Sequence, residues 1–175
     1  MTGCTHPHRT AMLPLVHAPL TPDAAMRAAI ELAEQGMRGG HGGPFGCVIV
    51  QRGAIVGRGH NRVTSSNDPT AHAEIVAIRA ACAALATFRL DDCELFTSCE
   101  PCPMCLAAIY WARIPRVWFA NTRADAAASG FDDERLYREL ALPLPQRAVA
   151  MTQLLRDEAQ VAFRTWPTLP GKTPY

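Results

Sequence analysis

The chain has 175 residues, of which 49% are hydrophobic and 19% are charged, with 17 Lys+Arg against 16 Asp+Glu. The length fits one domain, and the composition is that of a globular protein and excludes a disordered chain. A net charge of +1 argues against a nucleic-acid partner, because phosphate contacts require a basic excess, although a local basic patch stays open. We therefore expect a small, weakly charged substrate.

The first twenty residues do not have the pattern of a targeting or membrane segment. Their apolar residues are interrupted by Pro14, His17 and Pro19, so the continuous apolar core of a secretory signal is missing. No apolar run in the chain approaches the roughly 18–20 residues that a membrane helix requires. We therefore expect residues 1–20 to form a flexible N-terminal extension of a cytoplasmic protein that has no membrane partner.

The next segments alternate between helix and strand patterns. A helix is predicted to begin at Thr21-Pro22, where a capping hydroxyl precedes proline, and to end at Gly39-Gly40. Apolar runs over 45–50 and 54–59 flank a Gln-Arg-Gly turn, which predicts a β-hairpin. Residues 61–70 are rich in Ser and Asn and are expected to form a polar loop.

The second half continues with helices and buried strands. Its order predicts an α/β fold, a three-layer α/β/α sandwich in which helices cover both faces of a mixed central sheet of about five strands. No domain boundary is visible, so residues 21–175 are expected to form a single domain. The predicted strands cover 94–98 and 117–120, and the predicted helices cover 71–86 and 102–113 and lie near 133–140 and 157–166.

Two cysteines stand three positions apart where the second of these helices begins. That spacing lets the sulfurs of Cys102 and Cys105 face one ion, and the positive end of the helix stabilises thiolates. His72 begins the preceding helix and supplies a nitrogen donor. Three protein ligands leave a fourth position for water, which is typical of catalytic zinc. The pattern therefore predicts Zn²⁺ held by His72, Cys102 and Cys105.

Glu74 follows His72 by two positions and is the predicted catalytic residue. Its side chain projects differently from that of His72, so its carboxylate is available to move a proton to and from water. Two thiolates formally cancel the charge of zinc and weaken it as a Lewis acid. A nearby carboxylate that takes the proton of the bound water would compensate for this weakness. His-x-Glu followed by Pro-Cys-x-x-Cys is the motif of the zinc deaminases. We expect a hydrolase that releases ammonia from a ring amidine.

Cys99 makes this a run of three cysteines within seven residues. A ferredoxin-type iron–sulfur cluster would need another cysteine soon afterwards, and none follows Cys105. As a fourth ligand, Cys99 would instead create structural zinc in a non-catalytic module that binds a partner protein. That alternative gives no reason for Glu74, so we interpret Cys99 as a thiol at the end of a strand.

With these motifs the chain resembles the cytidine deaminase superfamily and, more narrowly, its bacterial zinc-dependent guanine deaminases. The resemblance implies a cytidine deaminase-like fold and hydrolysis of guanine to xanthine and ammonia in purine metabolism. It also implies a homodimer in which the C-terminal segment crosses to the neighbouring subunit. The similar stretches are Gly43–Gly46, Ser66–Glu74, Thr97–Arg113 and Gly130–Asp133.

The resemblance further implies a pocket for the purine base. From the residues alone, the asparagine in it also suits a turn, the two aromatic rings suit a core, and the aspartate suits a helix cap. A terminal residue is usually without a role, so only the resemblance assigns one to the last tyrosine. The implied residues are Asn61 and the Ala73 main chain as hydrogen-bonding groups, Phe45 and Trp111 against the ring, and Asp133 and Tyr175 completing the pocket.

Other substrates of the same chemistry stay open. They are guanosine, cytosine or cytidine, and adenosine in tRNA. The near-neutral charge argues against tRNA, which requires a basic surface. A C-terminal segment that closes over the pocket would favour a free base over a nucleoside.

Overall fold

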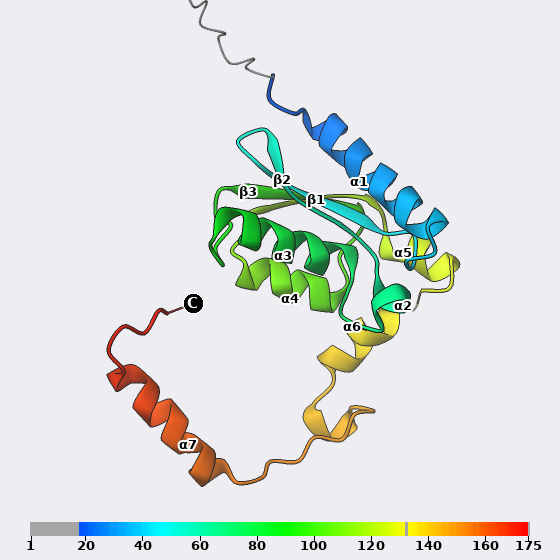
Figure 1. Cartoon of the computed structure of the whole chain (residues 1–175). Helices are drawn as coiled ribbons and strands as arrows, with labels where there is room; N and C mark the ends of the chain where they lie inside the picture. The colour runs from blue at the N-terminus through cyan, green and yellow to red at the C-terminus, as the bar shows by residue number, and fades with distance from the viewer. Residues whose placement is uncertain (1–17, 132, 175) are drawn as a thin grey trace, which may run out of the picture.

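The computed structural model describes residues 18–131 and 133–174 (Figure 1). Most of the predicted extension over 1–20 and the predicted pocket residue Tyr175 therefore lie outside the described residues. The elements are α1 (Pro22–Arg38), β1 (Gly46–Gln51), β2 (Ala54–His60), α2 (Val63–Ser66), α3 (Ala73–Leu85), β3 (Cys93–Cys99), α4 (Pro103–Trp111), β4 (Arg116–Asn121), α5 (Arg123–Ala128), α6 (Asp133–Ala141), the 3-10 helix η1 (Leu144–Gln146), α7 (Arg156–Thr165) and the 3-10 helix η2 (Trp166–Thr168).

A mixed sheet with strand order β2-β1-β3-β4 lies at the centre of the molecule. β1 pairs antiparallel with β2 and β3, whereas β3 and β4 are parallel. The predicted hairpin is confirmed, and its turn places Arg52 and Gly53 at φ angles of 49° and 77°. The sheet has four strands in the part of the chain that the structure describes, where the sequence led us to expect about five. Among the described residues, β4 is therefore an edge strand and pairs only with β3.

Helices cover both faces of this sheet, which confirms the α/β/α sandwich. In Figure 1, α1 lies on one face, and α3 and α4 lie on the other. Side chains alternate along β1, as the pleat requires. Val48 and Val50 pack with Phe96 and α1, while Cys47 and Ile49 belong to the cluster under α3.

Two glycines of β2 allow α3 to lie directly on the strand. A Cβ atom on Gly59 would come within 2.2 Å of the Ala73 carbonyl oxygen. One on Gly57 would come within 2.5 Å of a carbonyl oxygen in the next turn of the helix. No side chain fits at either position. The close approach of α3, with His72 and Glu74 at its start, therefore depends on these two glycines.

Two short helices were not predicted from the sequence. α2 forms one turn inside the expected polar loop, and α5 follows β4 directly. The start of α5 is a capping box: the Asp125 N–H donates to Thr122 Oγ1 at 3.3 Å, and the Thr122 N–H donates to the Asp125 carboxylate at 2.8 Å. Thr-x-x-Asp is a readable cap in the sequence, since short polar side chains satisfy the first helical N–H groups.

The chain leaves the layered body after α6. The predicted helices near 133–140 and 157–166 are confirmed as α6 and α7. Figure 1 shows α7, in orange and red, standing apart from the sheet. Apolar side chains of this C-terminal segment, residues 152–174, are exposed, with Leu154 at 80% and Phe163 at 75%. Among the described helices, none has the length and apolar character needed to cross a membrane.

Candidate metal centre and substrate pocket

The three predicted metal ligands meet where α3 and α4 begin. His72 is the N-cap residue of α3, and Cys102 is the N-cap residue of α4. Cys102 Sγ lies 3.6 Å from His72 Nδ1 and 3.6 Å from Cys105 Sγ, and Cys105 Sγ lies 3.6 Å from His72 Nδ1. Within 18–131 and 133–174, this is the one cluster of His, Cys, Asp or Glu side chains that could hold a metal ion.

The charge state of this cluster is set by its internal hydrogen bonds. The bond shared with Cys105, helped by the one with His72, lowers the pKa of Cys102 to about 4. The bond with Cys102 and burial raise the pKa of Cys105. The hydrogen bond with Cys102 also raises the pKa of His72. A divalent cation bound here would hold both sulfurs as thiolates, because coordinated thiols are deprotonated.

These donors fit zinc. Two sulfurs and one imidazole nitrogen are typical zinc ligands, and tetrahedral Zn–S bonds of about 2.3 Å place two sulfurs roughly 3.8 Å apart. Cys99 does not join them, because its Sγ donates to the Thr122 carbonyl oxygen at 3.6 Å. Burial raises the pKa of Cys99 to about 11, so this thiol stays protonated. The described residues thus offer three ligands, the number found at catalytic zinc.

Glu74 is buried beside this cluster and is 5% exposed. Its Oε1 accepts a hydrogen bond from Thr97 Oγ1 at 3.0 Å, and its Oε2 accepts one from Cys105 Sγ at 3.4 Å. Burial raises the pKa of Glu74, and these hydrogen bonds oppose that rise. A carboxyl group with a raised pKa is suited to accept a proton and return it. Thr97 was not predicted; only its position on the inner face of β3 could have indicated it.

A pocket of about 220 Å³ lies in front of the ligand cluster. It contains three of the predicted substrate residues, Phe45, Asn61 and Asp133, together with Glu74. Pockets for drug-sized ligands occupy about 300–1,000 Å³, so this one suits a small ring. The lining residues are Gly43, Phe45, Asn61, Val63, Thr64, His72, Glu74, Glu100, Cys102, Phe131 and Asp133.

Two aromatic rings and an amide form one side of the pocket. Phe45 and Phe131 make an edge-to-face contact with ring centroids 4.8 Å apart. Asn61 is 6% exposed, and its Oδ1 accepts hydrogen bonds from the N–H groups of Gly43, at 3.3 Å, and Val63, at 3.2 Å. The loop backbone therefore orients this side chain. Phe131 was missed as a pocket residue, although it stands beside the predicted aspartate.

Two further predicted substrate residues, Asp133 and Ala73, lie in different surroundings. Asp133 is the first residue of α6, and its charge contributes to the raised pKa of His72, behind the hydrogen bond from Cys102. Ala73 is fully buried between His72 and Glu74, and its side chain belongs to the core under α3. The structure thus brings Asp133 to the pocket. For Ala73, whose side chain is in the core, only the main chain stays a candidate contact to the base.

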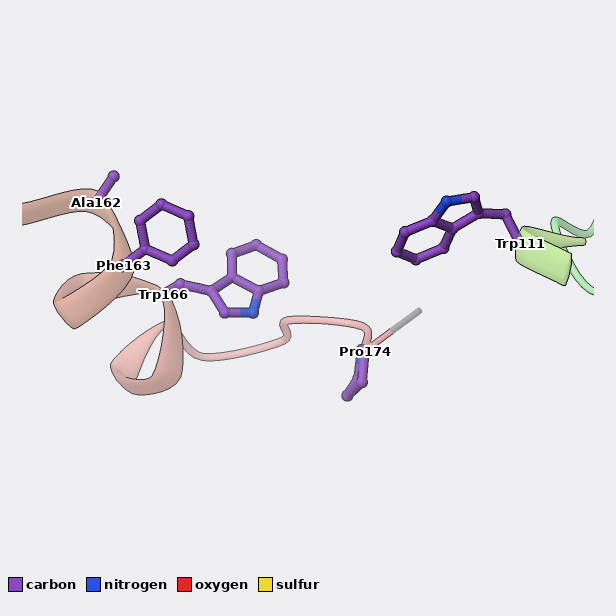
Figure 2. A pocket seen from close by; sticks show the side chains of 5 residues that line it. All are labelled: Trp111, Ala162, Phe163, Trp166 and Pro174. Atoms are coloured by element: carbon purple, nitrogen blue, oxygen red, sulfur yellow. The ribbon is translucent and has the colours of Figure 1, made fainter. Parts of the chain in front are cut away.

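Trp111 was expected to pack against the base, and the structure does not bring it to this pocket. It ends α4 and is 62% exposed, whereas Cys102 caps the other end. A rise of 1.5 Å per residue separates the two by roughly 13 Å along the helix. Figure 2 shows the indole facing Phe163 and Trp166 across an open hollow. The volume of this hollow is about 520 Å³. That larger hollow contains none of the predicted metal ligands.

A match to a family model over the first two thirds of the chain shows which family it belongs to. The family model of the cytidine and deoxycytidylate deaminase zinc-binding region matches residues 21–121. This stretch includes the three clustered ligands and Glu74. The chain belongs to this family of zinc-binding deaminases.

Individual relatives extend the comparison beyond that region. Guanine deaminase of Bacillus subtilis (strain 168) is 50% identical over 150 residues, which cover 86% of this chain and 96% of that protein. The X-ray structure of the Bacillus subtilis guanine deaminase has a TM-score of 0.86 at 48% identity and covers 89% of this chain and 99% of its own. A guanine deaminase from Nitrosomonas europaea has a TM-score of 0.63 at 30% identity and covers 95% and 100%.

A relative of different specificity matches a shorter part. The tRNA-specific adenosine deaminase of Aquifex aeolicus is 47% identical over 77 residues, which are 44% of this chain and 51% of that protein. The likeness to guanine deaminases therefore spans almost the whole chain, whereas this likeness is confined to about half of it.

Proposed function

We propose that the protein hydrolyses guanine to xanthine and ammonia, with zinc held by His72, Cys102 and Cys105. The observation that carries the proposal is the buried Glu74 carboxyl group, which shares a small pocket with the ligand cluster. The similarity to guanine deaminases, which continues past the zinc-binding region, supports guanine over other amino-substituted rings.

Zinc bound at these ligands would supply Lewis acidity that lowers the pKa of a water molecule. Glu74 takes the proton from that water, and the water oxygen adds to C2 of guanine, the carbon that carries the amino group. Glu74 then gives the proton to the adjacent ring nitrogen. Glu74 next takes the remaining proton of the hydroxyl group on the tetrahedral C2 and delivers it to the amino group. The C2–N bond then breaks as the C2 carbonyl forms, and ammonia leaves. Thr97 holds Oε1 of the carboxylate during these transfers and so keeps Oε2 beside Cys105 Sγ in the ligand cluster.

The pocket walls would recognise the flat, polar base. Phe45 and Phe131 offer apolar surface to the ring, and Asn61 offers hydrogen-bonding groups. The main chain of Ala73, between His72 and Glu74, would be a further hydrogen-bonding group. Asp133 at the start of α6 accepts hydrogen bonds from ring N–H groups. The carboxylate at 133 favours guanine because that base presents two adjacent donors, the N1–H and the 2-amino group, to an acceptor. The predicted role of Tyr175 in completing the pocket stays part of this proposal.

We propose further that residues 21–175 form one domain that is completed in a homodimer. Within the part of the chain that the structure describes, no strand pairs with the outer edge of β4, and exposed apolar residues of the segment 152–174 stand away from the body. A segment exchanged with a second copy would cover these surfaces and make Trp111 available to its neighbour. Light scattering during size-exclusion chromatography should give twice the chain mass of 19.0 kDa. A monomer across micromolar concentrations would contradict the exchange.

We also infer that the protein works in the cytoplasm. The six cysteines among the described residues are all free thiols, and zinc ligation by Cys102 and Cys105 requires reduced sulfur. Cell fractionation should find the protein with cytoplasmic markers, and recovery in a secreted fraction would contradict this inference.

Ammonia release by purified, zinc-loaded protein tests the function directly. We expect strong preference for guanine among guanine, guanosine, adenine, cytosine and cytidine, with xanthine as the product. Guanosine should be poor because the pocket is small. Preference for another ring would leave the chemistry standing and overturn the substrate. Inactivity toward all five substrates would overturn the deaminase assignment for the whole site.

A further inference from the structure

α6 brings Asp133 to the pocket, yet none of its nine residues is buried. Burial of apolar side chains ordinarily holds a helix against its neighbours. Leu136 and Leu140, the two leucines of α6, are instead 43% and 57% exposed. Apolar packing of α6 is therefore only partial, and polar contacts of this helix add to what holds the Asp133 carboxylate in place.

One such contact joins α6 to the metal-ligand loop. The Tyr137 hydroxyl donates a hydrogen bond of 3.1 Å to the Pro101 carbonyl oxygen. Pro101 directly precedes Cys102, one of the three clustered ligands. Tyr137 follows Asp133 by four positions, so both side chains lie on the same face of the helix. One turn of α6 thus spans from the ligand loop to the pocket.

A second set of contacts holds the Tyr137 ring itself. The Arg123 guanidinium carbon lies 4.8 Å from the ring centroid, and Arg123 Nε lies 4.0 Å from the Glu134 carboxylate. The Arg123 N–H donates to Glu100 at 3.0 Å, and Glu100 lines the pocket. Arg123 therefore connects α6 with the same loop and restricts the orientation of the ring.

We propose that Tyr137 is a positioning residue for purine binding, acting by holding the first turn of α6 against the Pro101 carbonyl. The inference rests on the proposed function, because it assigns to Asp133 the recognition of the base. The Tyr137 hydroxyl does not touch the reacting atoms. Its loss should weaken guanine binding and leave the proton transfers by Glu74 intact.

The test is Tyr137→Phe, which removes only the hydroxyl. We expect KM for guanine to rise roughly three- to tenfold, the range for the net loss of one neutral hydrogen bond, with kcat within about twofold and zinc content unchanged. Tyr110→Phe is the matched control, because it removes the same oxygen from a side chain of α4 that is 72% exposed. That control should leave both constants unchanged.

A double-mutant cycle separates positioning from a merely structural role. In an Asp133→Asn background, Tyr137→Phe should cause no further rise in KM, because the group that it positions is gone. An undiminished effect in that background would overturn the proposal. So would loss of zinc, or lowered melting temperature without a change in KM, in the single variant.

Hydrogen–deuterium exchange of residues 133–141 gives a readout that does not depend on turnover. Exchange should be faster in Tyr137→Phe than in wild type and unchanged in Tyr110→Phe. Equal exchange in all three proteins would overturn the tether. If wild type releases no ammonia from guanine, the proposed function fails, while faster exchange in Tyr137→Phe would still support the tether.

Discussion

Thr97 Oγ1 lies 3.0 Å from Glu74 Oε1 and donates a hydrogen bond that joins the central strand β3 to the helix α3. Both residues are buried, with Thr97 fully inaccessible. A carboxylate in such surroundings needs donors, because an unpaired buried charge is unfavourable. The contact therefore orients Glu74 and favours its ionised form, against the effect of burial.

Replacing Thr97 by Val should lower activity about tenfold or more. Val has nearly the same shape but lacks the hydroxyl, and a hydrogen bond to a charged group is worth about 1.5–3 kcal/mol. The loss should appear in kcat, since the proton transfers depend on Glu74. Zinc content, measured by mass spectrometry of the metal, should be unchanged. Activity equal to wild type would remove Thr97 from this role.

Ser98→Ala is the matched control for that variant. Ser98 is the next residue of β3 and faces away from the site, where its Oγ accepts from the Gly46 N–H at 3.0 Å. Its replacement removes a buried hydrogen bond and should cost about 1 kcal/mol of stability. If Ser98→Ala reduces kcat as strongly as Thr97→Val, the effect of the latter is one of stability.

Glu74→Gln should retain zinc and lose activity by about 10²–10⁴-fold. The amide preserves size but does not accept or return a proton, and acid–base assistance contributes about this factor. Steady-state assays at saturating guanine, with metal analysis of the same sample, check both parts. Near-normal turnover would remove Glu74 from its proposed role.

Cys102→Ala and Cys105→Ala should each lose zinc, whereas Cys99→Ala should keep it. The first two sulfurs belong to the ligand cluster, while Cys99 bonds to the Thr122 carbonyl oxygen. Cobalt substitution should show two thiolate ligands in both wild type and Cys99→Ala. Loss of one thiolate signal in Cys99→Ala would support the structural-zinc alternative, with Cys99 as fourth ligand.

Stability should fall in mildly acidic solution because of His60. Its ring stacks on His41, with 2.9 Å between His41 Nδ1 and His60 Nε2. Burial, followed by the charges of His41 and Arg62, lowers the pKa of His60 below 6.5. The unfolded chain therefore binds this proton more readily, so its contribution to stability is complete above pH 6.5 and is lost as pH falls through the lowered value.

His60→Gln should be less sensitive to pH in that window. Its melting temperature should fall less than that of wild type between about pH 7 and about pH 5, as measured by scanning calorimetry. His41→Gln should share part of the effect, because it removes a charge that faces His60. Parallel curves for wild type and His60→Gln would contradict this assignment.

The metal cluster could be predicted because its ligands lie at helix starts, which short sequence motifs reveal. Pro101-Cys102-Pro103 begins one helix, and His72 begins another. Both starts lie at one end of the sheet, so a short motif was enough to bring the three donors together. The α/β/α sandwich could also be predicted, because the order of helices and strands in the sequence allows few other arrangements.

Contacts that depend on tertiary placement were not predictable. Thr97 reaches Glu74 only because the pleat of β3 turns it toward α3. Trp111 lies in the same motif-rich run as the cysteines, but two and a half turns of helix carry it away from them. The described residues form a sheet of four strands where about five were expected, because strand pairing joins segments far apart in the chain and leaves no local signal.

The missing side chain of Gly59 has a consequence for how variants of this protein should be interpreted. A methyl group there would meet the Ala73 carbonyl oxygen at 2.2 Å and push the start of α3 off the strand. His72 and Glu74 would then move together, away from cysteines that stay in place on another helix. Gly59→Ala would thus resemble a lesion of the metal centre in every activity screen, although residue 59 touches neither metal nor substrate. Substitutions of Gly59, natural or engineered, therefore report on the distance between α3 and α4.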